Sequence, residues 1–374
     1  MANYLDYLEW RGDIPFDFDG FNEVDGLIFS QLSYTPLEGI LAREDMTPKT
    51  VAEVGEAFFS RYTEADYESG TALFKNCYEL LRHMYRTRRY AGVKLMNYRM
   101  EYDTELALQF GALTIEFAEG CFFVAYRGTD DTLAGWQEDF KLCYTMPVAS
   151  QAIAEGYLRR VLELLPGVRL YLGGHSKGGN LAMYAAMRMD PADKDRILGI
   201  YNYDGPGFLE EVVGQKAYLD IMDRIHSYMP HESIVGMILY HDSAYTIVNC
   251  TDRGIAQHTL STWQIRGRSC ETVEDFKKTS EIFNSAVRKW ITEISDEERE
   301  FFVSLVFSML EQGGETFSEL MANPRNTLVT LYQSYHGQDK ETKKMVRSIL
   351  RQLIVLSTRS VKENIHKDGN TESA

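Results

Sequence analysis

The sequence predicts an α/β fold in which helices cover a mainly parallel sheet. Residues 112–129, "ALTIEFAEGCFFVAYRGT", alternate apolar and polar side chains on both sides of a Glu-Gly pair, as a hairpin does. Residues 150–167, "SQAIAEGYLRRVLELLPG", have helical spacing that ends at Pro-Gly, and the short branched run "VRLYLGG" (168–174) follows as a buried strand. Strands that alternate with helices in this way are typical of a parallel sheet.

Later segments complete this pattern. Three more segments have the composition of strands: "RILGIYNYDGPG" (196–207), "YTIVNC" (245–250) and "STWQIRG" (261–267). After about residue 271 the strands stop, and "SDEEREFFVSLVFSMLEQGG" (295–314) opens with a serine three residues before a glutamate, which is a capping box. We therefore expect a helical extension or cap over residues 1–93, an α/β core over 94–270, and a helical region over 271–374 that packs on the core.

Charge excludes some classes of partner. The 374 residues include 39 Lys and Arg against 55 Asp and Glu, a net charge of −16 that repels nucleic acid. The cation-bearing runs "RHMYRTRRY" (82–90) and "KKMVRSILRQ" (343–352) are interleaved with apolar residues at helical spacing, so we interpret them as solvated helix faces. Peripheral contact of one of them with an anionic membrane surface is left open.

The sequence predicts no cofactor and no metal site. Its five cysteines are scattered without a CxxC pair, and its eight histidines include no HxxxH pair. Such cysteines are typical of reduced core residues. The first 20 residues lack the features of a secretory signal, and no apolar stretch approaches the ~20 residues of a transmembrane helix. We expect a cytoplasmic protein.

The stretch "YLGGHSKGGNLAMYAA" (171–186) contains the G-x-S-x-G pattern of a nucleophile elbow. Ser176 follows the predicted strand and precedes a helix rich in small residues, and Gly174 and Gly178 let strand and helix approach each other. The positive end of the helix lies at the serine, where the backbone N–H of Lys177 can stabilise an oxyanion. The alternative is a glycine-rich turn in which Ser176 only caps the helix.

A nucleophilic serine requires a base, and the α/β-hydrolase fold supplies its residues in the order nucleophile, acid, histidine. His258, in "GIAQHTLSTWQI" (254–265), follows a glycine-bearing loop and precedes an aromatic strand. A loop at this place can bring an imidazole to the carboxyl edge of the sheet. His175 is adjacent to Ser176, and its side chain is expected to point away from the serine hydroxyl. We choose His258 as the base.

Three segments in this order resemble class 3 lipases. "FFVAYRGTDDTLAGWQEDF" (122–140) is similar to their strand, turn and helix, "GGHSKGGNLA" (173–182) to their nucleophile elbow, and "QHTLSTW" (257–263) to their histidine loop. The resemblance covers about residues 94–267. Within this neighbourhood, the chain is similar to an uncharacterised bacterial lipase-like family, a domain of unknown function.

This resemblance implies Ser176 as nucleophile, His258 as base, and Thr129 as the second oxyanion-hole residue through its N–H and hydroxyl. It also implies an Asp in the segment "SYMPHESIVGMIL" (227–239), which contains none. The carboxylate of that segment is Glu232. Because His258 needs an orienting partner, other acids in the sequence are candidates as well.

Asp204 ends the strand after the nucleophile helix, a position that some other lipases use for the acid. The alternative is that Asp204 only fixes the turn before Gly205. We rank Asp204 slightly ahead of Glu232, with Asp242 third. Lys177 also departs from the resemblance, because lipases place an apolar residue after the nucleophile, and a cation there favours a polar or anionic substrate. The segment after Thr129 lacks an amphipathic lid, so interfacial activation is not expected.

Two functions are carried forward. The first is a serine hydrolase that cleaves a carboxylic ester or thioester through an acyl-enzyme on Ser176, without a cofactor, with the helical end regions capping the pocket. The second is a lipase-like scaffold that binds a ligand or partner protein without turnover. The missing Asp motivates it, because loss of the orienting acid costs about 10⁴ in kcat. A carboxylate within hydrogen-bond reach of His258 Nδ1 favours the first.

Overall fold

The structure is a computed structural model, and every structural statement below concerns the residues that it describes. Asp242, the third candidate acid, lies outside them, as does the whole chain after residue 347. The described residues are 2–130, 132–241, 243–278, 280–282, 284–285, 294–314, 316, 324–337, 340, 342–344 and 347.

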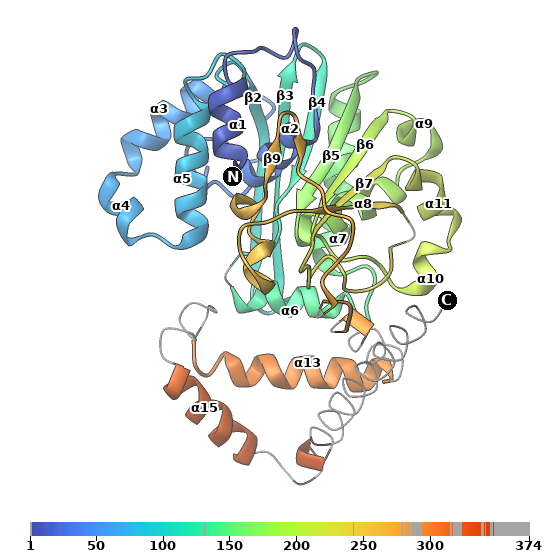
Figure 1. Ribbon diagram of the computed structural model, residues 1–374. Coiled ribbons are helices and arrows are strands. Elements are labelled where there is room, and N and C mark those ends of the chain that lie inside the picture. Colours follow the sequence, from blue (N-terminus) through green and yellow to red (C-terminus); the bar gives the residue numbers. More distant parts are fainter. Residues whose placement is uncertain are drawn as a thin grey trace, which may run out of the picture.

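An eight-stranded sheet forms the centre of the protein, and its strand order follows the chain from β1 to β8 (Figure 1). β4 to β8 make four parallel pairs, whereas β1 to β4 make three antiparallel pairs, so the predicted mainly parallel sheet is confirmed. The strands are β1 (Lys49–Thr50), β2 (Lys94–Asp103), β3 (Leu108–Ala118), β4 (Cys121–Tyr126), β5 (Arg169–His175), β6 (Ile197–Tyr203), β7 (Ile225–Pro230) and β8 (Tyr245–Val248).

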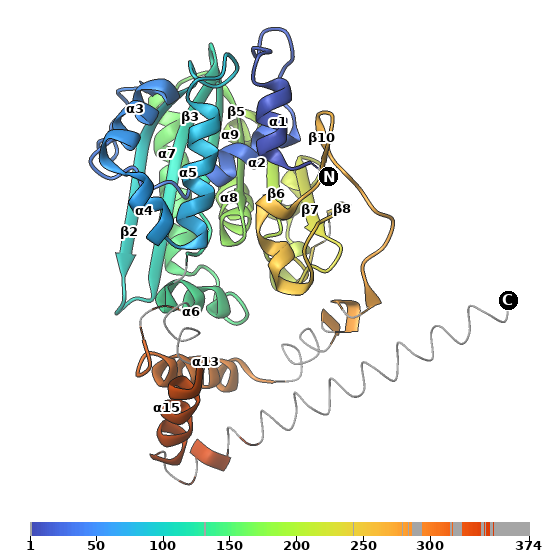
Figure 2. The ribbon, with the colours of Figure 1, turned by 60° about the vertical axis from the view of Figure 1, so that its left-hand side comes forward.

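Helices cover both faces of the sheet (Figures 1 and 2). Along β4, Phe123 and Ala125 face a core shared with α1, α2, α3 and α5, whereas Phe122, Val124 and Tyr126 face a core shared with α7, α8 and α11. This alternation follows from the period of two in a strand. The sheet with helices on both faces, and the nucleophile elbow between β5 and α8, form the predicted α/β-hydrolase fold.

The helices begin and end as follows. They are α1 (Tyr4–Arg11), α2 (Glu23–Leu32), α3 (Val51–Arg61), α4 (Glu64–Ser69), α5 (Ala72–Met84), α6 (Leu133–Lys141), α7 (Ala149–Leu164), α8 (Lys177–Met187), α9 (Pro191–Lys194), α10 (Glu210–Val213), α11 (Lys216–Met222), α13 (Asp296–Leu310) and α15 (Pro324–Gly337), with short 3₁₀ helices η1 (Gly254–His258) and η2 (Leu260–Thr262). None of the helices described is long and apolar enough to cross a membrane.

Most local predictions are confirmed. β3 and β4 form the predicted hairpin, in which Gly120 takes a positive φ of 68°. Ser295 caps α13 through the predicted capping box. The predicted strand at 261–267 is wrong in extent, because only β9 (Ile265–Arg266) forms there and pairs with β10 (Ser269–Cys270) in a separate two-stranded sheet. The three-part division of the chain stays a prediction.

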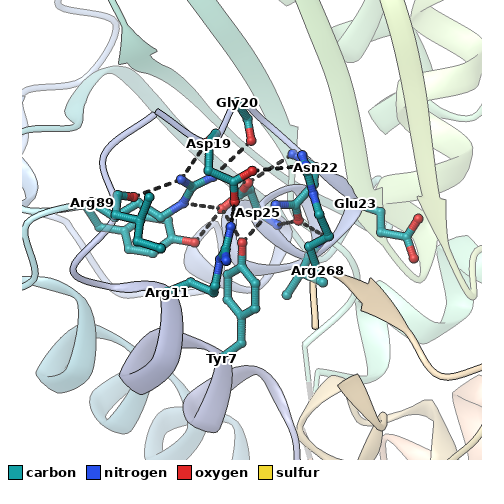
Figure 3. Close-up of polar contacts among 12 residues, drawn as sticks. Tyr7, Arg11, Asp19, Gly20, Asn22, Glu23, Asp25, Arg89 and Arg268 are labelled. Atoms are coloured by element: carbon teal, nitrogen blue, oxygen red, sulfur yellow. Dashed lines mark hydrogen bonds and ion pairs between the residues drawn. The ribbon is translucent and has the colours of Figure 1, made fainter. Parts of the chain in front are cut away.

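A buried ion pair connects the N-terminal helices to the turn before β2 (Figure 3). Arg89 and Asp25 have side chains that are 0% exposed, and two guanidinium nitrogens contact the two carboxylate oxygens at 2.9 and 2.6 Å. Tyr90 also donates to Asp25 at 2.5 Å. Backbone carbonyls accept the remaining guanidinium hydrogens, from Ile14, Asp19 and Gly20. This ion pair is therefore fully paired inside the fold.

The C-terminal helix α13 lies beside α6 (Figures 1 and 2). Val303 and Phe307 of α13 are buried against Leu133 of α6, and the Phe307 and Phe140 rings lie 5.7 Å apart. Arg299 of α13 donates to the carbonyl of Cys143 at 2.7 Å. This part of the C-terminal region therefore packs against α6 and the segment that directly follows it.

Candidate active site

Ser176 stands at the turn between β5 and α8, in a backbone conformation that side chains rarely adopt. Its φ is 57° and its ψ is −135°. A Cβ on Gly174 or Gly178 would collide with the carbonyl oxygen of Tyr126, so strand and helix approach this closely only because these positions are glycine. The Ser176 side chain makes no capping hydrogen bond to α8. The hydroxyl is therefore not used by the helix, contrary to the alternative of a capping serine.

Asp204 and His258 meet beside this turn. Asp204 directly follows β6, the strand that is parallel to β5, and His258 ends η1. His258 Nδ1 lies 2.6 Å from Asp204 Oδ2, and the Asp204 side chain is only 1% exposed. Because a carboxylate only accepts hydrogen bonds, Nδ1 carries a proton in this contact, and in the neutral imidazole Nε2 then presents a lone pair. This is the tautomer that a general base for a serine hydroxyl requires.

The backbone and neighbours of Asp204 hold its carboxylate in place. Its φ of 52° is the second positive value at the carboxyl edge of the sheet. The other oxygen, Oδ1, accepts from the Ser233 hydroxyl at 2.5 Å and from the Gly236 N–H at 3.1 Å. Both donors come from residues 227–239, the segment in which the resemblance implies an Asp. In this chain that segment supplies hydrogen bonds to the acid at the end of β6.

Glu232, the rival acid, faces another group. Its carboxylate pairs with Lys277 and accepts from the Gly254 N–H at 2.6 Å. The Lys277 ammonium is the main reason that the pKa of Glu232 is lowered. The Glu232 backbone N–H donates to the Gln257 side-chain oxygen at 2.9 Å. Glu232 therefore stabilises the loop that leads to His258. The structure brings His258 together with Asp204 and not with Glu232.

The loop after β4 brings Thr129 to the serine. A Cβ on Gly128 would lie 2.9 Å from Ser176 Cβ, so this loop runs directly against the elbow. The Thr129 hydroxyl donates to Asp139 Oδ2 at 2.7 Å. A hydroxyl has one hydrogen, so in this arrangement the backbone N–H of Thr129 is the donor that remains for an oxyanion. The Lys177 N–H, in the first turn of α8, also has no partner within its helix.

The Lys177 side chain corrects one prediction. We expected a cation beside the acyl group, which would favour an anionic substrate. Instead the side chain is 0% exposed, and its Nζ lies 2.7 Å from Glu138 Oε2 and 2.8 Å from the carbonyl oxygen of Gln109. The first turn of α8 directs it between β3 and α6, where Glu138 neutralises it. The charge of Lys177 therefore gives no reason to expect an anionic substrate.

Sequence reasoning missed the roles of two residues of the site, of which His175 supports the base. His175 Nε2 lies 2.7 Å from the carbonyl oxygen of His258, and its Nδ1 lies 2.9 Å from the hydroxyl of Tyr34. The His175 and His258 rings are 4.4 Å apart. Burial, followed by the neighbouring His258, holds the pKa of His175 well below 6.5. A neutral His175 thus connects Tyr34, in the N-terminal region, to the loop that carries the base.

Asp139 is the other missed residue. It is held next to Thr129, and its Oδ1 has no hydrogen-bond partner among the described residues. Burial raises the pKa of Asp139 to about 6, while Lys177 and the Thr129 hydroxyl lower it. Asp139 belongs to the segment "GWQED" (135–139), but nothing local to the sequence indicates that its side chain contacts Thr129, ten residues earlier. Among the described residues, no group of three or more His, Cys, Asp or Glu could hold a metal ion.

The chain is similar to one protein family and to several solved structures. The family model described as Mbeg1-like matches residues 84–308. A comparison with curated proteins found no match. A mutant form of MDLA from Penicillium cyclopium is 12% identical with a TM-score of 0.34, and the match covers 61% of this chain and 78% of that one.

Two lipases are also similar in structure. A Rhizomucor miehei lipase in a complex with its propeptide is 14% identical with a TM-score of 0.31, and the match covers 43% of this chain and 57% of that one. A lipase from Rhizopus microsporus var. chinensis is 15% identical with a TM-score of 0.33, and the match covers 46% of this chain and 64% of that one. The present chain therefore spans less than two thirds of the length of both lipases.

Proposed function

The chain belongs to the Mbeg1-like family, and for this member we propose a serine hydrolase that cleaves a carboxylic ester or thioester through an acyl-enzyme on Ser176. The observation that carries the proposal is the 2.6 Å contact between His258 Nδ1 and the buried Asp204 carboxylate, next to the strained turn of Ser176. An orienting acid favours turnover over the binding scaffold, whose motivation was the absence of such an acid.

The reaction follows from the position of each group. His258 Nε2 takes the proton of Ser176 Oγ as the oxygen attacks the acyl carbon, and Asp204 stabilises the resulting imidazolium. The N–H groups of Thr129 and Lys177 hold the oxyanion of the tetrahedral intermediate. His258 then gives the proton to the leaving alcohol or thiol. A water molecule, deprotonated by His258, attacks the acyl-enzyme and releases the carboxylic acid.

The cellular location belongs to the proposal as well. All five cysteines are free, and four of them are buried. Unpaired cysteines of this kind fit a reducing compartment, so we place the protein in the cytoplasm. Its partner is a small acyl ester or thioester, and peripheral contact with a membrane is compatible with this assignment.

Fluorophosphonate labelling tests the proposal directly. The purified protein, Ser176→Ala and His258→Ala are labelled in parallel and then assayed with p-nitrophenyl esters of increasing chain length. Matched controls are Ser60→Ala and His83→Ala, which change the same residue types on α3 and α5. We expect labelling and turnover in the wild type and both controls, with neither in the two site variants. Folded wild-type protein that is neither labelled nor active on any ester would favour the binding scaffold.

A further inference from the structure

The oxyanion hole of the proposed hydrolase is built from two separate segments. The Thr129 N–H comes from the loop after β4, whereas the Lys177 N–H comes from the first turn of α8. Such donors act only when both lie about 2.7–3.1 Å from the oxyanion position. A 1 Å misplacement can cost about 10² in rate. Some contact must therefore fix the loop relative to the helix.

A buried ion pair makes this connection. Lys177 and Glu138 have side chains that are 0% and 1% exposed, and their charged atoms lie 2.7 Å apart. Glu138 lies on α6, and two backbone groups hold its carboxylate. Its Oε1 accepts from the Ser150 N–H at 2.8 Å and its Oε2 from the Gln109 N–H at 3.3 Å. The ammonium of Lys177 is thus fixed at a point between α6 and β3.

The same contacts continue to Thr129. Asp139, the neighbour of Glu138 on α6, accepts from the Thr129 hydroxyl at 2.7 Å and lies 3.8 Å from Lys177 Nζ. Gln109 contacts both Lys177 and the loop after β4. Its carbonyl accepts from Lys177 Nζ at 2.8 Å, and its side-chain amide donates to the Gly128 carbonyl at 3.4 Å. Two routes therefore connect the Lys177 ammonium to the loop that presents the Thr129 N–H.

We propose that Lys177 and Glu138 are positioning residues, whose buried ion pair sets the distance between the two N–H donors of the oxyanion hole. The proposal rests on the proposed hydrolase function. It assigns the Lys177 side chain a task that its backbone N–H alone does not explain. The cost of burying two charges argues for such a task, since an apolar pair of similar volume is often as stable or more stable.

The experiment removes both charges together. Lys177→Met/Glu138→Gln keeps the backbone N–H of Lys177 and an amide oxygen for the Ser150 N–H, and it removes both charges of the pair, while Asp139 keeps the hydrogen bond from the Thr129 hydroxyl. The matched control is Arg89→Met/Asp25→Asn, which neutralises the other buried ion pair (Figure 3). Each protein is assayed with a short p-nitrophenyl ester and with a trifluoromethyl ketone, whose tetrahedral adduct places an oxyanion in the hole. Thermal unfolding confirms that each variant is folded.

We expect kcat of the Lys177→Met/Glu138→Gln variant to fall about 10²-fold with KM unchanged, and affinity for the trifluoromethyl ketone to fall by a similar factor. The control should keep wild-type kcat and inhibitor affinity, because its contacts lie among the N-terminal segments. A purely structural role of the Lys177 pair would instead lower stability and leave these two quantities in place. A folded variant with wild-type kcat overturns the proposal.

Glu138→Gln alone keeps the test decisive if the double variant does not fold. Its amide oxygen remains an acceptor for the Ser150 N–H, while Lys177 keeps its bonds to Gln109. We expect an intermediate loss of kcat, and a wild-type value would overturn the proposal. Failure of the hydrolase assignment is distinguishable, since it would leave the wild type itself without labelling or turnover.

Discussion

Two buried ion pairs in the part of the chain that the structure describes have similar chemistry and different surroundings. Both have side chains with at most 1% exposure. Around Arg89 and Asp25, all three guanidinium nitrogens and both carboxylate oxygens are paired. Lys177 and Glu138 are also paired at every charged atom, but their neighbour Asp139 has an Oδ1 with no hydrogen-bond partner among the described residues.

Backbone strain also differs between the two regions, and the strained residues lie near Lys177. Ser176 and Asp204 have φ values of 57° and 52°, and both lie at the carboxyl edge of the sheet close to Lys177. Residues in such conformations cost about 1–3 kcal/mol each and persist where the surrounding structure enforces them. We infer that the pair without strained neighbours stabilises the fold, and we propose that the strained residues at the sheet edge, Ser176 and Asp204, are the groups available for chemistry.

The largest expected effect is a loss of kcat on substitution of Asp204, one of the two strained residues. Asp204→Asn should lower kcat about 10⁴-fold, because an amide that donates to His258 stabilises the wrong tautomer. Steady-state ester hydrolysis measures the loss. Glu232→Gln is the matched control, and it should stay near the wild-type kcat because Glu232 contacts Lys277 and the Gly254 N–H. Equal losses in the two variants would contradict the assignment of Asp204 as the orienting acid.

In the Arg89–Asp25 pair, the expected effect is on the free energy of unfolding. Asp25→Asn leaves the Arg89 guanidinium buried without its counter-ion, which should lower the free energy of unfolding by about 3–5 kcal/mol. Urea denaturation measures this change. The exposed pair Lys94 and Glu116 provides a control, because Lys94→Met should cost about 0–1 kcal/mol. If Asp25→Asn instead reduced kcat per folded molecule, the contrast between the two regions would be lost.

A smaller effect concerns acid sensitivity at the site. The pKa of His175 is held well below 6.5, so below about pH 6.5 the unfolded chain binds a proton that the folded protein does not. The stability contributed by neutral His175 is therefore present above this pH and is lost as the pH falls below it. His175→Gln keeps an N–H that can reach the His258 carbonyl but does not titrate.

Urea denaturation at about pH 7 and about pH 5 tests this linkage. We expect the free energy of unfolding to fall less in His175→Gln than in the wild type over this interval. The comparison of slopes does not depend on any constant loss of stability that the substitution causes. Identical slopes would mean that His175 takes up its proton equally in both states.

The part of the site that the sequence could predict is the part formed by local contacts. The G-x-S-x-G pattern identified Ser176 because the strand, the turn and the helix are consecutive. The choice between Asp204 and Glu232 stayed open, since it depends on where the loop of His258 folds back across 54 residues. The direction of the Lys177 side chain was missed for the same reason, because Glu138 lies 39 positions away.

Strand prediction had a comparable limit. β7 was not predicted as a strand, because "IHSYMP" mixes polar and apolar residues, and its place between β6 and β8 buries all of them except His226. The segment 261–267 has the composition of a strand, but 3₁₀ turns and the Trp263 indole N–H, which donates to Gln257, use most of it to hold the loop of His258. Tertiary contacts decided both cases.

Mass spectrometry of the acyl-enzyme tests directly whether Ser176 is the nucleophile. The wild type is mixed with a p-nitrophenyl ester, quenched in acid and digested with trypsin, which releases the peptide "LYLGGHSK" (170–177). We expect the acyl mass on this peptide at Ser176. It should accumulate in the first turnover and disappear as the ester is consumed. Turnover with no acyl mass on Ser176, or with the acyl group on another residue, would contradict it.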